Sequence, residues 1–368
     1  MEDPLYFPRT ELAAALLSSL KSGVSNAFTL FAPRRMGKTQ FLTNDIAPAA
    51  EKNGFNVFYF SFMDNKDSAG TAQFFHEALH RFALETRTGN GVKTFFGSLT
   101  KIDVLGVGLE RETPPRDLPG ISEIIAYIAA DSRPTLLLLD EAQELARLPN
   151  TEGMIRSLRT GLDINQSRVK TLFTGSSTNG LRAMFNDIKA PFFHFSHALD
   201  FPTLGQDFID FLAGVYHDRT GQQLDAEKFY AIFEQFNKSP MYIRAVIQDM
   251  IINPALSLEA AAQVRLEQMQ ENSNIPMQWK ALSAIERLLL QSMAQGEVSP
   301  YGAEFREQAA RILGVESVKV STVQSAIRKL QRKDLISKFG NSAFQINNPL
   351  LQKLNRSEER RVGKECRS

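Results

Sequence analysis

The sequence predicts an α/β domain, a parallel β-sheet flanked by helices, followed by an all-α region and a three-helix unit with a hairpin. Short, almost continuously apolar runs alternate with longer helical patterns over the first part of the chain. After Pro202 the pattern changes to helices only, from Gln206 to about Gln270. Near the end, Gly340 and Asn341 interrupt a strand-like segment, as is typical of a hairpin turn.

The composition is that of a water-exposed globular protein with room for two or three domains. The chain has 368 residues, 43% hydrophobic and 23% charged. No apolar run approaches the ~20 residues that a membrane helix needs. The segment 12–20 follows Glu2, Asp3 and Glu11 and lacks a basic leader, so it predicts a short helix opened by Thr10 and not a signal sequence. A cytoplasmic location is expected.

The segment 356–368, RSEERRVGKECRS, resembles the translation of a sequencing-adapter oligonucleotide and is set aside as an artefact; a solvated basic tail is the alternative. It holds five basic and three acidic residues, so without it the net charge changes from +1 to −1. Cys366, the one cysteine, lies in it. The rest of the chain therefore has no disulfide or cysteine metal site, which suits a reducing compartment.

Five apolar runs in the first domain predict strands that are buried on both faces. They are AFTLF, FNVFYFSF, TLLLLD, VKTLFTG and FFHFSHALDF. Helical patterns at 71–86 and 121–131 lie between them. The stretch 87–120 interrupts the alternation, and 99–110 suggests an inserted hairpin.

Helical patterns fill the second region from Gln206 to about Gln270, with Gly221 and Pro240 as punctuation. Three further helices and a two-stranded wing then predict a winged helix-turn-helix, whose third helix would enter a DNA groove. Their ranges are 278–294, 302–313, 321–332 and, for the wing, 337–346. The predicted domains are the α/β domain at 1–202, a helical lid at 203–275, a winged helix at 276–355 and the tail at 356–368.

The stretch AFTLFAPRRMGKTQFL nearly matches the phosphate-binding pattern GxxxxGK[ST], with Ala32 in place of the first glycine. Such a loop aims backbone N–H groups at phosphates, its lysine reaches the outer phosphates, and its hydroxyl holds magnesium. A plain surface turn is the alternative. The candidate nucleotide-binding residues are Ala32, Pro33, Arg34, Arg35, Met36, Gly37, Lys38, Thr39 and Gln40, and Lys38 is also a candidate catalytic residue.

Asp140 and Glu141 directly follow the most apolar strand, where unpaired acids would be costly to bury. A magnesium nucleotide explains both: Thr39 and Asp140 would hold the metal, and Glu141 would be the general base. Capping of the next helix is the alternative and accounts for one acid better than for two. The next strand ends in Thr174, Ser176 and Ser177, whose hydroxyls could reach the γ-phosphate or the attacking water; a common Gly-Ser turn is the alternative.

Together these motifs resemble the AAA+/STAND-type P-loop ATPases of the archaeal-ATPase group, which are related in architecture to archaeal replication initiators. The resemblance covers residues 5–355 and rests on FPRTEL, APRRMGKT, LLLLDEAQEL, LFTGSSTNGLRAMF and FQINNPLLQKL. It implies ATP and Mg²⁺ as cofactors and ATP hydrolysis as the activity. It places 174–177 at the position called sensor 1, with Ser176 as a candidate catalytic residue, and Arg9 and Glu11 near the base. Members usually carry glycine where this chain has Ala32.

Arginines form a separate group of candidates, because relatives use one to stabilise charge on the transferred phosphoryl group. Arg182, after sensor 1, and Arg244, at a lid position, are candidates for this role; a structural or surface role is the alternative for each. The role of Arg34 and Arg35 stays open. The histidines show no metal-ligand grouping and are expected to be structural.

The charge pattern bears on the partner of the winged helix. Residues 275–355 contain eleven Lys or Arg against six Asp or Glu, which indicates a nucleic-acid or acidic partner. Phosphates would be met by Arg328, Lys329, Arg332 and Lys333, and base edges by Ser321, Thr322, Gln324 and Ser325. A solvated helix face or a protein contact is the alternative.

The expected function is therefore an ATP-hydrolysing switch or motor coupled through the lid to the winged helix. The alternatives are a non-hydrolysing nucleotide-dependent regulator, a protein-interaction scaffold, and a DNA-binding regulator whose ATPase half is incidental. A homo-oligomer or a protein partner is compatible with each, and no membrane partner is expected.

Overall fold

A computed structural model of the chain describes residues 3–63, 68–88, 92–97, 118–148, 150–176, 184–185, 190–271, 275–295, 299–333, 335–339 and 343–347. The chain divides into two units, Pro8–Phe201 and Met1–Phe7 with Pro202–Ser368. Residues that the sequence assigned to the start of the first domain, Asp3 to Phe7, thus group with the C-terminal unit.

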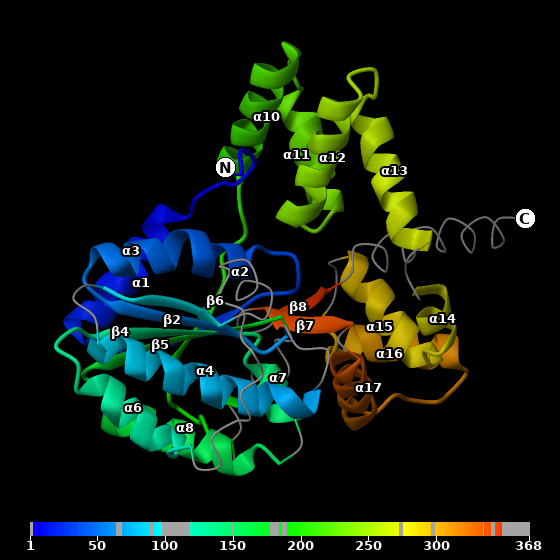
Figure 1. Cartoon of the computed structure of the whole chain (residues 1–368). Helices are drawn as coiled ribbons and strands as arrows, with labels where there is room; N and C mark the ends of the chain where they lie inside the picture. Colours follow the sequence, from blue (N-terminus) through cyan, green and yellow to red (C-terminus); the bar gives the residue numbers. More distant parts are fainter. Residues whose placement is uncertain are drawn as a thin grey trace, which may run out of the picture. The chain divides into compact units, whose positions relative to one another are not determined.

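The first unit is built on a sheet whose six strands are all parallel (Figure 1). The order of the strands is β3-β2-β4-β5-β1-β6. Their bounds are β1 Ala27–Phe31, β2 Asn56–Ser61, β3 Thr94–Gly97, β4 Thr135–Asp140, β5 Val169–Gly175 and β6 His197–Asp200. Because the strands are parallel, all their carboxyl ends lie at one edge of the sheet, and β5 separates β1 from β4 at that edge.

Helices cover both faces of this sheet (Figure 1). One core joins α1, η1 and α3 to side chains such as Leu30, Val57 and Leu138, and the other joins α4, α6 and α8 to Phe58, Leu139 and others. Alternate residues of a strand point to opposite faces, so apolar residues at every position serve both cores. The helices are α1 Thr10–Ser22, α2 Lys38–Gln40, the π-helix η1 Phe41–Ile46, α3 Ala47–Lys52, α4 Ser68–Thr88, α6 Ile121–Ala129, α7 Gln143–Arg147 and α8 Glu152–Ile164.

Two sequence predictions for this sheet were wrong. Strand β3 lies inside the interrupted stretch and was missed, because four residues at a sheet edge give little periodic signal. Of FFHFSHALDF, only His197–Asp200 forms a strand; it is an edge strand with mostly exposed residues, not a buried one. Phe192 and Phe195 form turns instead and pack around Phe173. The inserted hairpin predicted at 99–110 lies outside the described residues.

The C-terminal unit is helical, and its last described element is a small antiparallel hairpin. Its elements are α10 Gln206–Thr220, α11 Ala226–Gln235, α12 Pro240–Ile252, α13 Leu258–Glu271, α14 Ile275–Lys280, α15 Ala284–Gln295, α16 Ala303–Leu313, α17 Val320–Arg332, β7 Ile336–Phe339 and β8 Ala343–Ile346. Helices α15 to α17 with β7 and β8 form the winged helix-turn-helix. The predicted helix at 278–294 is broken, because Ser283 and Glu286 form a capping box that starts α15 anew.

Among the described residues, no helix has both the length and the apolar character that crossing a bilayer requires.

The close packing of α6 on α8 depends on Gly161. A Cβ atom added there would lie 2.9 Å from both the Ser122 Cα and the Ile125 Cδ1. We expect Gly161→Ala to lower the free energy of unfolding by about 1–3 kcal/mol in urea titrations, because backbone cannot yield as a side chain can. In the same helix, Gly153→Ala is the matched control: a Cβ there has no neighbour within 4 Å. Equal effects of the two changes would contradict this account.

Candidate nucleotide site

The loop between β1 and α2 has the backbone of a phosphate-binding turn. Gly37 lies in the left-handed region with φ 87°, where glycine is favoured, and it starts α2. Arg35 is also left-handed, with φ 69°, which is costly for a residue with a Cβ. Ala32 is not among the described residues with positive φ, so alanine fits there without backbone strain. The unusual position in this loop is therefore Arg35, not Ala32.

Lys38 lies buried inside this loop. Its Nζ donates hydrogen bonds to the carbonyl oxygens of Ala32 and Pro33, each 2.8 Å away. An ammonium held there carries the charge that the outer phosphates of a nucleotide need.

Asp140 joins the loop to the central strands. Its Oδ2 accepts hydrogen bonds from the Thr39 Oγ1 at 2.6 Å and from the Tyr59 hydroxyl at 3.3 Å. Its Oδ1 accepts from the Thr174 hydroxyl and from the Glu141 N–H. The Thr39 hydroxyl and the Asp140 carboxylate are hard oxygen donors, the kind that Mg²⁺ takes, so this pair fits the metal that the motif implies.

Glu141 follows Asp140 and is almost fully buried, with a left-handed φ of 53°. Three donors converge on its Oε2: the Ser176 N–H at 3.0 Å, the Ser176 hydroxyl at 2.6 Å and the Gln143 Nε2 at 2.5 Å. Burial raises the pKa of Glu141, but these hydrogen bonds and the charge of Lys38 outweigh it, so the pKa lies below its usual range. The carboxyl is therefore ionised at neutral pH, as a general base must be.

Arg9 connects the loop to the end of the first unit. Its Nη2 donates to the Met36 carbonyl oxygen at 3.4 Å, and its guanidinium lies 4.2 Å from the centre of the Phe201 ring. Its backbone N–H donates to the Asp45 carboxylate at 3.2 Å, within the π-helix that follows α2. The resemblance placed Arg9 near the base; here it contacts the loop itself.

The other predicted residues lie in different places. Gln40 ends α2 directly after the loop, while Arg34 donates from its Nε to the Ser176 hydroxyl at 3.3 Å. Burial and the neighbouring Arg34 charge lower the pKa of Arg35. Arg244 lies on α12 of the C-terminal unit and forms an ion pair with Asp3. Arg182 and Ser177 lie outside the described residues, so the catalytic role of Arg182 stays a prediction.

Two residues of this cluster escaped the sequence analysis. Tyr59 reaches Asp140 from β2, and Gln143 holds Glu141 from the first turn of α7. A phenol in the mostly apolar run 55–62 and a glutamine two residues after Glu141 were the available signals. Among the described residues, no group of three or more His, Cys, Asp and Glu could hold a metal.

The strand order and the pairing of loop and acid define the fold of a P-loop ATPase. No protein-family model and no curated protein matches the chain. Among solved structures, it is similar to a Walker-type ATPase of Pyrococcus abyssi, with 14% identity, a TM-score of 0.62 and coverage of 95% of this chain and 96% of that one.

The chain is also similar to the ORC2 protein of Aeropyrum pernix, solved in an ADP form and in ADPNP–ADP complexes. The identity is 16%, the TM-scores are 0.53 and 0.54, and the match covers 100% of this chain and 98% of that one. The chain thus shares its fold with these proteins: a parallel sheet flanked by helices, followed by a helical region and a three-helix unit with a hairpin.

The two positions that carry glycine in the phosphate-binding pattern, here Ala32 and Gly37, give a direct test of the loop geometry. We expect Gly37→Ala to lower the free energy of unfolding by about 1–2 kcal/mol, because alanine is strained at this positive φ. Ala32→Gly is expected to leave the dissociation constant of ADP unchanged within about twofold, since no strain at Ala32 is relieved. Urea unfolding and calorimetric titration measure the two effects. A tenfold gain in affinity for Ala32→Gly would show that the missing glycine limits binding.

Proposed function

We propose that this protein binds and hydrolyses ATP with magnesium and uses the nucleotide state as a molecular switch. The observation that carries the proposal is the convergence of Thr39, Asp140, Glu141 and Ser176 at the carboxyl edge of the sheet. The nucleotides bound by the solved ORC2 protein support ATP as the ligand.

Each residue would have a distinct task. Lys38 and the N–H groups at the start of α2 would bind the β- and γ-phosphates, because this helix end presents a positive dipole. Thr39 and Asp140 would hold Mg²⁺, which when bound neutralises charge on the phosphates. Glu141 would take a proton from the attacking water, and Ser176 would orient that water.

A specific observation favours the slower alternative, a nucleotide-dependent regulator with little turnover. The Oε2 of Glu141 already accepts three hydrogen bonds, all of which stabilise the carboxylate and make it a weaker base. Turnover then depends on Oε1, the other carboxylate oxygen of Glu141.

Glu141→Gln separates the two functions. If Glu141 is the general base, phosphate release should fall by about 10²-fold or more while ATP binding persists, because the amide keeps the shape of the side chain but cannot take a proton. Phosphate release and fluorescent-nucleotide titration are the measurements. Lys38→Ala is the control for binding and should lose affinity. Unchanged phosphate release in Glu141→Gln, with ATP still bound, would assign the chain to the regulator class.

We also propose that the winged helix binds DNA through the exposed face of α17. Val323, Ile327 and Leu330 pack inward, which leaves a polar and basic face in solvent. That face consists of Ser321, Thr322, Gln324, Ser325, Arg328, Lys329 and Arg332.

Lys333, which directly follows α17, does not belong with the three basic residues of that helix. Its Nζ lies 3.5 Å from the carboxylate of Glu286, which is itself buried. Burial raises the pKa of Glu286, but hydrogen bonds from Ser283 and the charge of Lys333 lower it below its usual range. Lys333 therefore has a structural task within the unit, and the alternative of a protein contact remains for the exposed face.

A gel shift across a salt series tests this surface. Replacement of Arg328, Lys329 and Arg332 by alanine should weaken binding to duplex DNA and reduce the salt slope by about one unit for each phosphate that the variant no longer neutralises. Lys333→Ala should leave the slope unchanged and lower the free energy of unfolding, because it leaves a buried carboxylate unpaired. Absence of a shift at low salt, or the same slope in the triple variant, would favour the protein contact.

A further inference from the structure

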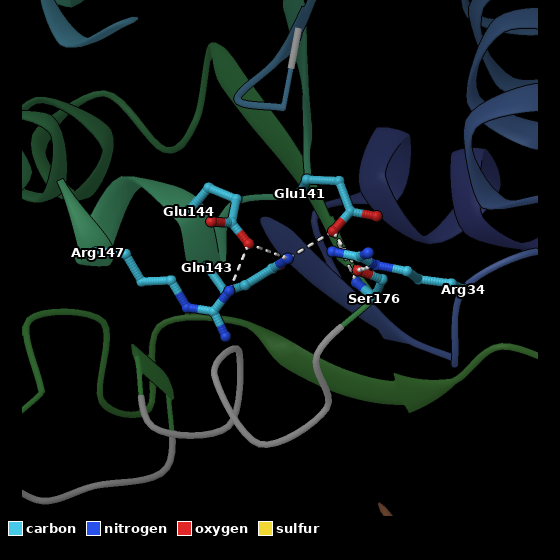
Figure 2. A network of polar contacts seen from close by, with 6 residues as sticks. All are labelled: Arg34, Glu141, Gln143, Glu144, Arg147 and Ser176. Carbon is cyan, nitrogen blue, oxygen red and sulfur yellow. Dashed lines mark hydrogen bonds and ion pairs between the residues drawn. The ribbon is translucent and has the colours of Figure 1, made fainter. Parts of the chain in front are cut away.

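A continuous chain of hydrogen bonds runs from the phosphate loop through Glu141 to α7 (Figure 2). Arg34 donates to the Ser176 hydroxyl at 3.3 Å, and that hydroxyl donates to the Glu141 Oε2 at 2.6 Å. On the other side, the Gln143 Nε2 donates to Glu141 at 2.5 Å and to Glu144 at 3.3 Å. Arg147 completes the chain with a 2.7 Å ion pair to Glu144.

The donors in this chain fix the orientation of Ser176. A serine hydroxyl has one proton, and the Arg34 Nε–H can only donate. When Arg34 fills a lone pair of the Ser176 oxygen, the one proton of the hydroxyl is left to point at Glu141. Because a charged donor polarises the hydroxyl, the bond from Ser176 to Glu141 becomes stronger.

Gln143 fixes the carboxylate from the opposite side. Its NH₂ group lies between two carboxylates, Glu141 and Glu144, so the amide cannot be turned over without placing its oxygen against them. The carbonyl oxygen of Gln143 is buried and has no hydrogen-bond partner among the described residues. An unsatisfied buried acceptor costs stability, so packing alone does not explain a glutamine at this position.

We propose that Arg34 is a positioning residue for the general base: through Ser176 it holds the Glu141 carboxylate against Gln143. Of the two arginines of the loop, Arg34 is assigned this role because its Nε donates to the Ser176 hydroxyl. The side chain of Arg34 is exposed, so its contact with Ser176 adds little to the core. This inference rests on the proposed ATPase function and assigns a task within that site.

A double-mutant cycle tests whether Arg34 acts through Ser176. Arg34→Met keeps the length of the side chain without its donors, and Ser176→Ala removes the hydroxyl. In single-turnover hydrolysis at saturating ATP, each change should slow the rate by about tenfold, the value of one charge-assisted hydrogen bond. The double variant should be no slower than Ser176→Ala alone, because Arg34 then has nothing to position.

Arg35→Met is the matched control, since it removes the same charge from the same loop. Its effect on the rate should multiply with that of Ser176→Ala. Arg34→Lys, which keeps one donor, should recover most of the rate that Arg34→Met loses. The comparison of Arg34→Lys with Arg34→Met changes only an exposed residue, so it can be made even if Ser176→Ala does not fold.

The outcomes separate the inference from the function on which it rests. The positioning role is overturned, and the ATPase function left intact, if hydrolysis requires Glu141 but one of two further results is found. Either the effects of Arg34→Met and Ser176→Ala are independent, or Arg34→Lys recovers none of the rate. Wild-type turnover no faster than that of Glu141→Gln overturns the ATPase function, and the role of Arg34 in hydrolysis with it. Both the ATPase function and the positioning role are supported if the effects of Arg34→Met and Ser176→Ala on the rate do not multiply and Arg34→Lys recovers the rate.

Discussion

The carboxylate of Asp140 is the interaction on which the first unit depends. It is almost wholly buried and accepts hydrogen bonds from Thr39, Tyr59, Thr174 and the N–H of Glu141. These donors come from α2, β2, β5 and the chain that follows β4. Because a buried carboxylate without donors would be costly, the one charge aligns the loop helix with three strands at the same edge of the sheet.

Much of the fold could be predicted from local sequence because its parallel strands are buried on both faces. Apolar runs such as 27–31 and 135–140 coincide with β1 and β4 for this reason. The edge strands were harder, since β3 is short and β6 has exposed residues and no continuous apolar run. The break before α15 depends on a capping box at Ser283, which outweighs an unbroken amphipathic pattern.

The site was predictable only as far as motifs reach. Lys38, Thr39 and Asp140 were identified from spacing, and the structure brings Thr39 and Asp140 into contact. The tasks of Tyr59 and Gln143 depend on strand order and on the turn after β4, which no local pattern reports. The sequence made Ala32 look like the anomaly of the loop, whereas the backbone shows that Arg35 is the residue in the costly conformation.

The contact of Arg9 with Phe201 brings together the two chain segments that connect the units. Two peptide segments join the units, one ending at Pro8 and the other starting at Phe201. Arg9 binds the Met36 carbonyl and lies over Phe201, whose own N–H donates to Phe31 at the entrance of the loop. The two segments that lead to the C-terminal unit therefore contact each other through Arg9 and Phe201, and they contact the backbone of Met36 and Phe31. The points at which both connecting segments leave the first unit are therefore fixed by the backbone of the phosphate loop and by the end of β1.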